Sequence, residues 1–317
     1  MILKKIREYA ALTSGDFNKI FTGLDVPPLP SAAVRLLELI RGGEAPLHEI
    51  GVVIESDSGL AVQVLRVVNS AMFGIPNQIS SIKKAVSILG LKTIEKIVLA
   101  QAVIEVVKDP KNEFFDQEAF WSDSLFRALA AREIALIKGM EADEAFIGGL
   151  LQDIAIPVLL KDWWKSYGKV FSKASEQGKR LSSVEQEMLS WDHAQAAAWI
   201  ASQWQLPDIL VCCVGVHVLE VDVLKKLGLI HGAPAAVALS ALIPSSLNPE
   251  PDFVSFCREG SKLGISMANL AKVLEKSRDM FQETAGAFGI ETRVGECFPR
   301  FTRENRQEWQ GEEALSG

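Results

Sequence analysis

Apolar residues recur at the spacing of an α-helix along almost the whole chain. In residues 31–40, for example, the apolar side chains fall on one helical face, at Ala33, Leu36, Leu37 and Ile40. Glycines and prolines interrupt this pattern repeatedly, and no stretch alternates apolar and polar residues as a strand does. The sequence therefore predicts an all-α protein, built as a two-lobed helical bundle with short polar connections.

One polar, proline-containing connection divides the predicted helices into two groups. It has the sequence Lys-Asp-Pro-Lys-Asn at residues 108–112. We expect an N-terminal helical lobe at residues 1–110 and a second helical lobe at 111–245. Residues 246–317 should add C-terminal helices and a polar tail that pack on the second lobe. A hydrophobic content of 48% is enough for well-filled cores in lobes of this size.

Charge, cysteine pattern and hydropathy exclude several classes of protein. The net charge of −7 argues against nucleic-acid binding, although a basic group at Lys83, Lys84, Lys92 and Lys96 leaves a nucleic-acid regulator as a remote alternative. The four cysteines form no C-x-x-C pair, which is typical of apolar residues in a reducing compartment. The N-terminus lacks a signal-peptide pattern, and no apolar run reaches the roughly 18 residues of a membrane span. We expect a cytoplasmic protein that binds neither membrane nor nucleic acid.

Seven segments follow one another in an order that points to a known family. Residues 27–102 contain PPLPSAAVRLLELI, IESDSGLAVQVLRVVNSAMFG and ISSIKKAVSILGLKTIEKIVLAQ. Then come FWSDSLFRALAAREIA at 120–135, AFIGGLLQDIAIPVLL at 145–160, E-x-x-x-L-x-W-D-H-A at 185–194 and WQLPDILVCCVGVH at 204–217. Over roughly residues 20–245 the chain resembles the HDOD domain, the HD-related output domain of bacterial signalling proteins.

The resemblance implies a fold and a function. The family is all-helical and related to the HD superfamily of metal-dependent phosphohydrolases, so the second lobe should be a degenerate HD-domain-like bundle. We expect a non-catalytic regulatory output module that docks a signalling protein or binds a small anionic signal, such as a nucleotide or cyclic dinucleotide, and responds by changing the packing between lobes. The alternative is a weakened metal-dependent phosphohydrolase or phosphodiesterase acting on such a nucleotide.

The resemblance also gives positions for the HD metal site. That site uses a first histidine, a His-Asp pair and a late aspartate, because imidazole and carboxylate groups hold divalent metals that activate water. Here the first histidine position is Asp123, and the pair is Gln152-Asp153. The late aspartate would lie near Ser240 or Ala241 and is missing.

The related HD-GYP phosphodiesterases provide three further positions. Two additional histidines of those proteins fall at His193 and His217. A lysine that follows their His-Asp pair is replaced by Ile156, which offers no charge to a phosphate. The resemblance therefore implies a site that has kept some ligands and lost its phosphate-binding cation.

Five residues remain as candidates for a remnant cavity: Asp123, Gln152, Asp153, His193 and His217. Any divalent metal would take Asp123, Asp153, His193 and His217 as ligands, since Gln152 is at best a weak neutral one. In the structural alternative, Asp123 pairs with Arg127 one turn along its helix, and the other groups are hydrogen-bonded. Because Gln152 replaces a histidine ligand, we favour this alternative and expect no catalytic residue, no metal and no cofactor.

Three further residues have structural interpretations. Asp192 is the expected N-cap of a helix that starts at His193. Asn69 should bond backbone carbonyls at a helix end. Pro157 should either kink the helix that carries Asp153 or begin a new one, because proline cannot donate a backbone hydrogen bond.

Overall fold

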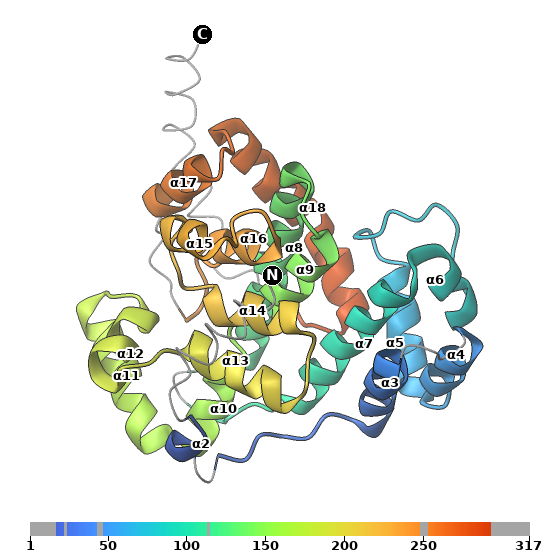
Figure 1. Cartoon of the computed structure of the whole chain (residues 1–317), viewed down its shortest axis with the longest axis horizontal. Helices are drawn as coiled ribbons and strands as arrows, with labels where there is room; N and C mark the ends of the chain where they lie inside the picture. Colours follow the sequence, from blue (N-terminus) through green and yellow to red (C-terminus); the bar gives the residue numbers. More distant parts are fainter. Residues whose placement is uncertain (1–16, 22–23, 43–46, 113–114, 248–252, 293–317) are drawn as a thin grey trace. The chain divides into compact units, whose positions relative to one another are not determined.

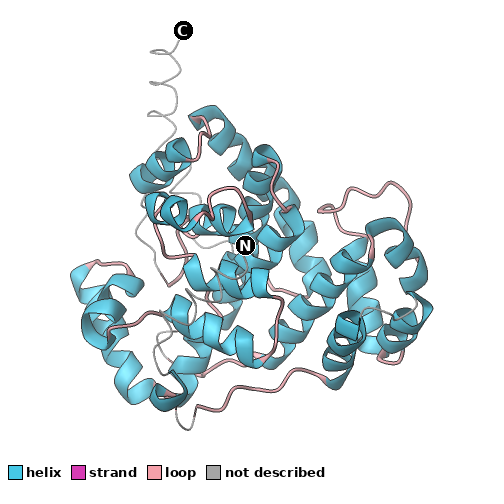
Figure 2. Ribbon diagram, in the orientation of Figure 1, coloured by secondary structure: helices cyan, strands magenta, loops and turns pink. Residues whose placement is uncertain are grey.

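The computed structural model describes residues 17–21, 24–42, 47–112, 115–247 and 253–292. Within these ranges the chain forms helices joined by turns and loops and contains no strand (Figures 1 and 2). This arrangement confirms the predicted all-α class. None of the described helices is long and apolar enough to cross a membrane.

The first helices in chain order are α2 (Phe17–Ile20), α3 (Ser31–Gly42), α4 (Leu47–Glu55), α5 (Ser58–Val68), α6 (Ile82–Leu89), α7 (Leu91–Val106), α8 (Gln117–Lys138), α9 (Ala142–Leu151) and α10 (Ala155–Asp162). They are followed by α11 (Trp164–Gln177), α12 (Leu181–Leu189), α13 (His193–Gln203), α14 (Asp208–Val216), α15 (Val221–Leu227), α16 (Ala233–Ser240), α17 (Phe253–Lys262) and α18 (Met267–Phe288).

These helices belong to two compact units. The larger unit comprises residues 109–279 and the described part of residues 1–26, and the smaller comprises 27–108 and 280–292. The predicted first lobe included the N-terminal residues, but Phe17 and Phe21 lie against Trp191 of the larger unit, with ring centroids 5.8 and 5.2 Å away. The described residues of the predicted first lobe begin at Phe17, and none of the predicted polar tail beyond residue 292 falls within the described residues.

The smaller unit is a set of short helices whose ends are fixed by local hydrogen bonds. Asp57 caps α5 by accepting from the backbone N–H of Leu60 at 3.0 Å. At the other end of α5, Asn69 donates to the carbonyls of Leu65 and Ile79 at 2.7 and 2.8 Å. Its amide oxygen also accepts from the N–H of Ile79 at 2.7 Å. Asn69 therefore has the predicted carbonyl-bonding role, and it also ties the loop before α6 to the end of α5.

The larger unit contains helices that approach one another closely at two adjacent glycines of α9. A Cβ atom at Gly149 would lie 2.9 Å from the Cα of Ala128 in α8. A Cβ atom at Gly148 would lie 2.5 Å from the Cβ of Cys213 in α14. Because glycine has no Cβ, α9 packs tightly between α8 and α14. This packing fixes the C-terminal end of α9, from which the polar cavity is built.

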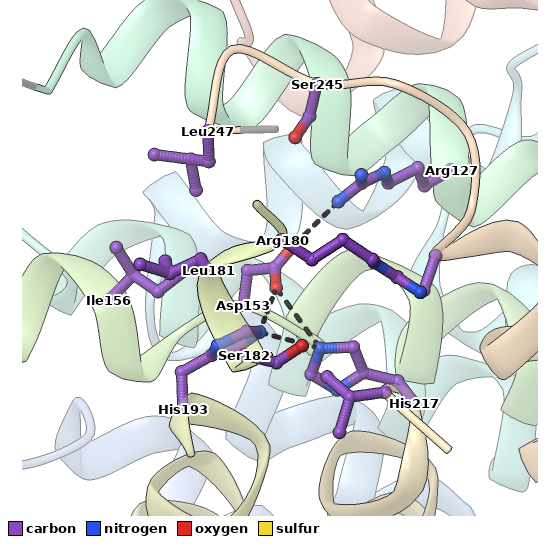
Figure 3. Close-up of a pocket in the computed structure, with 12 residues that line it drawn as sticks. Arg127, Asp153, Ile156, Arg180, Leu181, Ser182, His193, His217, Ser245 and Leu247 are labelled. Carbon is purple, nitrogen blue, oxygen red and sulfur yellow. Dashed lines mark hydrogen bonds and ion pairs between the residues drawn. The ribbon is translucent and has the colours of Figure 1, made fainter. Parts of the chain in front are cut away.

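The chain turns sharply after α9. Gln152, Asp153 and Ile154 lie in the connection, and α10 begins at Ala155. The structure has the second of the two predicted alternatives: a new helix, α10, begins, and Pro157 lies in its first turn. The N–H groups of a first turn have no intrahelical partner, so proline loses no hydrogen bond there. The interruption leaves Asp153 between two helices, with its carboxylate in the cavity shown in Figure 3.

Candidate functional site

A small polar cavity lies within the larger unit (Figure 3). Its polar lining residues come from helices and loops far apart in the sequence and are Arg127, Asp153, Arg180, Ser182, His193, His217 and Ser245. The cavity has a volume of about 20 Å³, which is room for about one water molecule. Ile156, which the resemblance aligns with a lysine, also lines it and offers no charge to a ligand.

Three buried side chains converge in this cavity. Asp153 Oδ1 lies 3.3 Å from His193 Nε2 and 3.2 Å from His217 Nε2. The two Nε2 atoms are 3.1 Å apart. His193 is the first residue of α13 and His217 follows the last residue of α14, so the packing of these two helices brings the imidazoles together.

The outer nitrogen of each imidazole is also occupied. Nδ1 of His193 lies 2.6 Å from Glu185 Oε2, and Nδ1 of His217 lies 2.7 Å from the carbonyl oxygen of Val214. A carbonyl or an ionised carboxylate can only accept a hydrogen bond, so both Nδ1 atoms carry hydrogen. Both Nε2 atoms are therefore directed toward Asp153, as Figure 3 shows.

Glu185 joins this group to two further elements. It lies in α12, is fully buried, and accepts from the backbone N–H of His193 at 2.9 Å. Its other oxygen accepts from the hydroxyl of Tyr167 in α11. Each oxygen of Glu185 thus has a donor, which satisfies a carboxylate that has no contact with solvent.

Arg127 holds the opposite side of Asp153. One guanidinium nitrogen donates to Asp153 Oδ2 at 2.9 Å, and Nε donates to the carbonyl oxygen of Ile243 at 2.8 Å. The structure thus differs from the predicted pairing of Arg127 with Asp123, whose Oδ2 accepts from the backbone N–H of Ser246. Asp153 is the more deeply buried carboxylate, so it gains more from a cationic partner.

The five predicted candidates do not form one cluster. Among the described residues, the atoms that converge as a potential metal-ligand group belong to Asp153, His193 and His217, all within 4.8 Å of one another. Asp123 is not a member of that group. Gln152 is fully buried, and neither its amide nitrogen nor its amide oxygen has a hydrogen-bond partner.

The electrostatics of the cluster favour opposite charges on Asp153 and His193. Burial opposes ionisation of Asp153, but the hydrogen bonds of His193 and His217 and the charge of Arg127 hold its pKa well below the usual range. Burial likewise opposes protonation of His193, yet the charge of Glu185 and the bond to Asp153 raise its pKa to about 10. Burial raises the pKa of Asp123. At neutral pH the cluster in this form contains an aspartate and an imidazolium.

Sequence reasoning missed three contributors to the site: Tyr167, Arg180 and Glu185. Glu185 belongs to the same E-x-x-x-L-x-W-D-H-A segment as His193, but the two residues lie in different helices. A turn at Ser190, which has a φ of 63°, reverses the chain between them. Residue spacing alone does not reveal a contact made across such a turn. The same segment did reveal Asp192, which caps α13 as predicted by accepting from the N–H of Gln195 at 3.0 Å.

Comparison with known proteins supports the resemblance. The model of the HDOD domain matches residues 26–218. Among solved structures, an HDOD domain protein of unknown function from Geobacter sulfurreducens is 17% identical, covers 98% of this chain and 96% of its own, and has a TM-score of 0.58. A Shewanella amazonensis protein with the provisional name phosphohydrolase is 24% identical, covers 83% of this chain and 94% of its own, and has a TM-score of 0.64.

One curated relative also matches. It is an uncharacterized protein of Treponema pallidum, 24% identical over 195 residues. The match covers 61% of this chain but 37% of that protein, so the chain spans little more than a third of the relative's length. At these identities the solved structures show a common fold, and the activity has to be argued from the site.

Proposed function

The chain belongs to the HDOD domain family, and from that premise we propose that it is a non-catalytic signal-transduction module that docks a partner protein or binds a small anionic signal. The observation that carries the proposal is the bonding of Asp153. Its Oδ2 accepts from Arg127, and its Oδ1 contacts His193 and His217. The carboxylate thus lies in a closed network, whereas hydrolysis needs open positions for both water and phosphate.

The size and charge of the cavity limit the signal that it would bind. A volume of about 20 Å³ does not hold a nucleotide without movement of the lining residues. Arg180 lines the cavity, and its fixed positive charge favours a small anion over a neutral molecule. In this proposal the lining residues move to admit a phosphate-sized group, because the cavity as it stands has room for about one water molecule. Any protein partner docks elsewhere on the surface.

A turnover assay tests the non-catalytic part of the proposal. Purified protein would be incubated with Mn²⁺, Fe²⁺ or Zn²⁺ and with a generic phosphodiester or a cyclic dinucleotide. We expect hydrolysis no faster than that of the Asp153→Ala variant under the same conditions. Robust metal-dependent hydrolysis that disappears in Asp153→Ala would overturn the proposal.

An isothermal titration tests the anionic signal. Inorganic phosphate serves as the probe, and we expect saturable binding that weakens at least about tenfold in Arg180→Ala, as for the loss of one charge-assisted contact. Lys225→Ala is a matched control, because Lys225 is a cation of α15 outside the cavity lining. Equal affinity in both variants would remove the cavity as the anion site.

A second function has a specific observation in its favour. The residues Asp153, His193 and His217 fit a divalent metal, because two imidazole nitrogens and a carboxylate oxygen converge at 3.1–3.3 Å. A metal held there would supply an activated water for phosphoryl transfer. The chain would then be a weakened HD-type phosphohydrolase. The turnover assay distinguishes the two functions.

A further inference from the structure

We propose that Trp163, Trp191 and Trp199 form a docking surface for a partner protein that presents two aromatic side chains one helical turn apart. The chain's own Phe17 and Phe21 occupy this surface, which we call the tryptophan cradle, and the partner takes their place. The inference rests on the proposed docking function, to which it gives a surface and a kind of partner.

The cradle holds its occupant by ring contacts. The ring of Phe21 lies 5.1–5.3 Å from the rings of all three tryptophans. The ring of Phe17 stacks on that of Phe21 at 5.1 Å and packs edge to face on Trp191 at 5.8 Å. Both phenylalanines are almost fully buried, with exposed fractions of 2% and 3%. Buried aromatic anchors of this kind contribute much of the binding energy of protein interfaces.

The occupant has the form of a bound peptide. Its helix, α2, has four residues, a length at which a helix has no stability of its own. Ile20, between the two anchors, is exposed. The N–H of Asp25 donates to Asp162 at the end of α10 at 3.2 Å. Short helical ligands are held in grooves in the same way, by apolar anchors at i and i+4.

The cradle is accessible to a competing segment. Trp163 and Trp199 remain half-buried with the phenylalanines in place, so the rim of the cradle faces solvent. The chain between the occupant and α3 is non-helical at residues 24–30, which include three prolines. The occupant can therefore leave the cradle without breaking a longer helix.

The cradle selects aromatic anchors at one spacing. Three indole rings surround the ring of Phe21, and aromatic rings attract one another beyond the effect of buried area. Residues four apart lie on one face of a helix, whereas residues two apart do not. A partner therefore needs an aromatic pair spaced as Phe17 and Phe21 are. It also has to bind more tightly than the free segment, because a tethered segment acts at an effective concentration on the order of 1 mM.

The position of the cradle suits a signalling surface. Trp191 is followed by Asp192, which caps α13, and by His193, which lines the polar cavity. A partner on Trp191 would thus contact the turn that places His193. Docking then takes place beside the cavity rather than in it.

The test uses a full-length variant in which the cradle is open. Phe17→Ala combined with Phe21→Ala removes both anchors, and far-UV circular dichroism checks that this open variant is folded. A labelled peptide with the sequence of residues 16–25, DFNKIFTGLD, is titrated with it by fluorescence anisotropy. We expect saturable 1:1 binding, a blue shift of tryptophan fluorescence, and binding to the unmodified chain that is at least about tenfold weaker. No binding to the folded open variant would overturn the inference.

Matched substitutions test the anchors and the cradle. The Ile20→Ala peptide should bind like the original, because that side chain is exposed, whereas the peptide with Phe17→Ala and Phe21→Ala should not bind. In the open variant, Trp199→Leu should weaken binding at least about tenfold. Met188→Ala, at an exposed residue of α12, should leave the affinity unchanged. Equal effects of Trp199→Leu and Met188→Ala would remove the cradle as the binding site.

A peptide of unrelated sequence tests the kind of partner. An alanine-rich helical peptide with phenylalanines at i and i+4 should bind the open variant within about tenfold of the chain's own segment. The same peptide with phenylalanines at i and i+2 should bind at least about tenfold more weakly, because its two rings do not share a helical face. Comparable affinities for the two spacings would contradict recognition of anchors one turn apart.

The unmodified chain covers the case in which the open variant does not fold. The peptide then competes with the tethered segment, so we expect binding at peptide concentrations on the order of 1 mM. Saturation-transfer NMR should show transfer from the protein to the phenylalanine ring protons of the peptide of residues 16–25. Absence of transfer to these protons at about ten times that concentration would rule out exchange at the cradle.

Light scattering separates a partner protein from a second copy of this chain. We expect no dimer that depends on the two phenylalanines. A dimer of the unmodified chain that dissociates in Phe17→Ala with Phe21→Ala would assign the cradle to the segment of a second copy and contradict the partner protein.

Failure of this inference differs from failure of the proposed function. Peptides that do not bind remove the cradle and leave the turnover and phosphate experiments unaffected. Metal-dependent hydrolysis overturns the non-catalytic function, whereas the peptide titrations still report whether the cradle accepts an aromatic pair.

Discussion

Asp153 is the residue on which the properties of the cavity depend, because each of its oxygens has a different kind of partner. The Oδ2 atom belongs to a buried ion pair with Arg127, and Oδ1 contacts two imidazoles. A buried carboxylate needs such partners, since an unpaired charge in the interior is very unfavourable. The cluster therefore contributes to folding whether or not it binds a ligand.

Removal of Arg127 should show how much the ion pair contributes. Arg127→Met leaves Asp153 without its cation and the Ile243 carbonyl without its donor. We therefore expect the free energy of unfolding to fall by about 3–5 kcal/mol. Urea denaturation measures the change. The double variant Arg127→Met, Asp153→Asn should lose less free energy of unfolding than the two single variants together, because Asp153→Asn removes the unpaired charge. Strict additivity would show that the two side chains do not interact.

Tyr167 gives a pH-dependent prediction. Burial first, and then the charge and hydrogen bond of Glu185, raise its pKa well above the ordinary value near 10. A raised folded-state pKa means that the stabilisation is complete below pH 10 and is lost as the pH rises further, because the unfolded phenol ionises first. The chain has two tyrosines, so the Tyr9→Phe variant leaves Tyr167 as the only phenol.

Ultraviolet absorption near 295 nm follows the ionisation of that phenol. In Tyr9→Phe, we expect no tyrosinate signal at pH 10 to 11, followed by its appearance together with the loss of helical circular dichroism. Stability measured by urea denaturation should fall over the same pH range. A reversible titration near pH 10 in the folded protein would contradict the buried bond to Glu185.

What the sequence predicted at the residue scale depended on the range of the interaction. Asp192 was identified as a cap because its partner, Gln195, is three residues away and the signature is local. Arg127 was assigned to a neighbour on its own helix, whereas its actual partners are 26 and 116 residues away. Contacts of that range follow from how helices pack, which residue spacing does not specify.

At the scale of helices, the glycines of α9 determine how closely its neighbours approach. Gly149→Ala would place a Cβ atom 2.9 Å from the Cα of Ala128, so either α8 or α9 has to move. We expect overpacking to lower the free energy of unfolding by about 1–3 kcal/mol. That loss outweighs the gain of up to about 1 kcal/mol from the better helix propensity of alanine.

Gly286→Ala is the matched control for this substitution. Gly286 lies in α18, is exposed, and has nothing within 4 Å of its virtual Cβ atom. Only the helix propensity then changes, so we expect the free energy of unfolding to increase by about 0.5–1 kcal/mol. Equal effects of the two substitutions in thermal denaturation would contradict the close packing of α8 on α9.

Helix positions followed well from the apolar pattern, but some interruptions did not. Residues 155–177 are divided into α10 and α11 at Trp163, where no glycine or proline marks the break. Trp163 has a φ of −118° and its ring lies 5.3 Å from that of Phe21. A break at an aromatic residue with a distant partner has no local signature in the sequence.

For the whole chain, the division into units depends on contacts that are remote in sequence. Residues 17–26 adjoin the segment at 27–108 in the chain, yet they belong to the larger unit. The sequence predicted the all-α class, since helical periodicity is a local property. It did not predict this grouping, because the responsible aromatic contacts join Phe17 and Phe21 to Trp163, Trp191 and Trp199.

The same contacts make the N-terminal segment a measurable part of the larger unit. The ring of Phe21 is buried and lies 5.1–5.3 Å from the rings of Trp163, Trp191 and Trp199. Phe21→Ala removes these contacts and leaves a cavity among the three indoles. We expect the free energy of unfolding of the larger unit to fall by about 3–5 kcal/mol. Tryptophan fluorescence should shift to the red, because water then reaches the indoles.

Ile20→Ala is the matched control, because it lies in the same short helix but its side chain is exposed. For that variant we expect the free energy of unfolding to change by less than about 0.5 kcal/mol, with no shift in tryptophan fluorescence. Hydrogen exchange adds the decisive comparison between the units. In Phe21→Ala, amides of α13 should exchange faster, whereas those of α5 in the smaller unit should keep their wild-type rates, since the three indole rings that Phe21 contacts all belong to the larger unit. Equal acceleration in both helices would show that the segment stabilises the chain as a whole rather than the unit against which its aromatic rings pack.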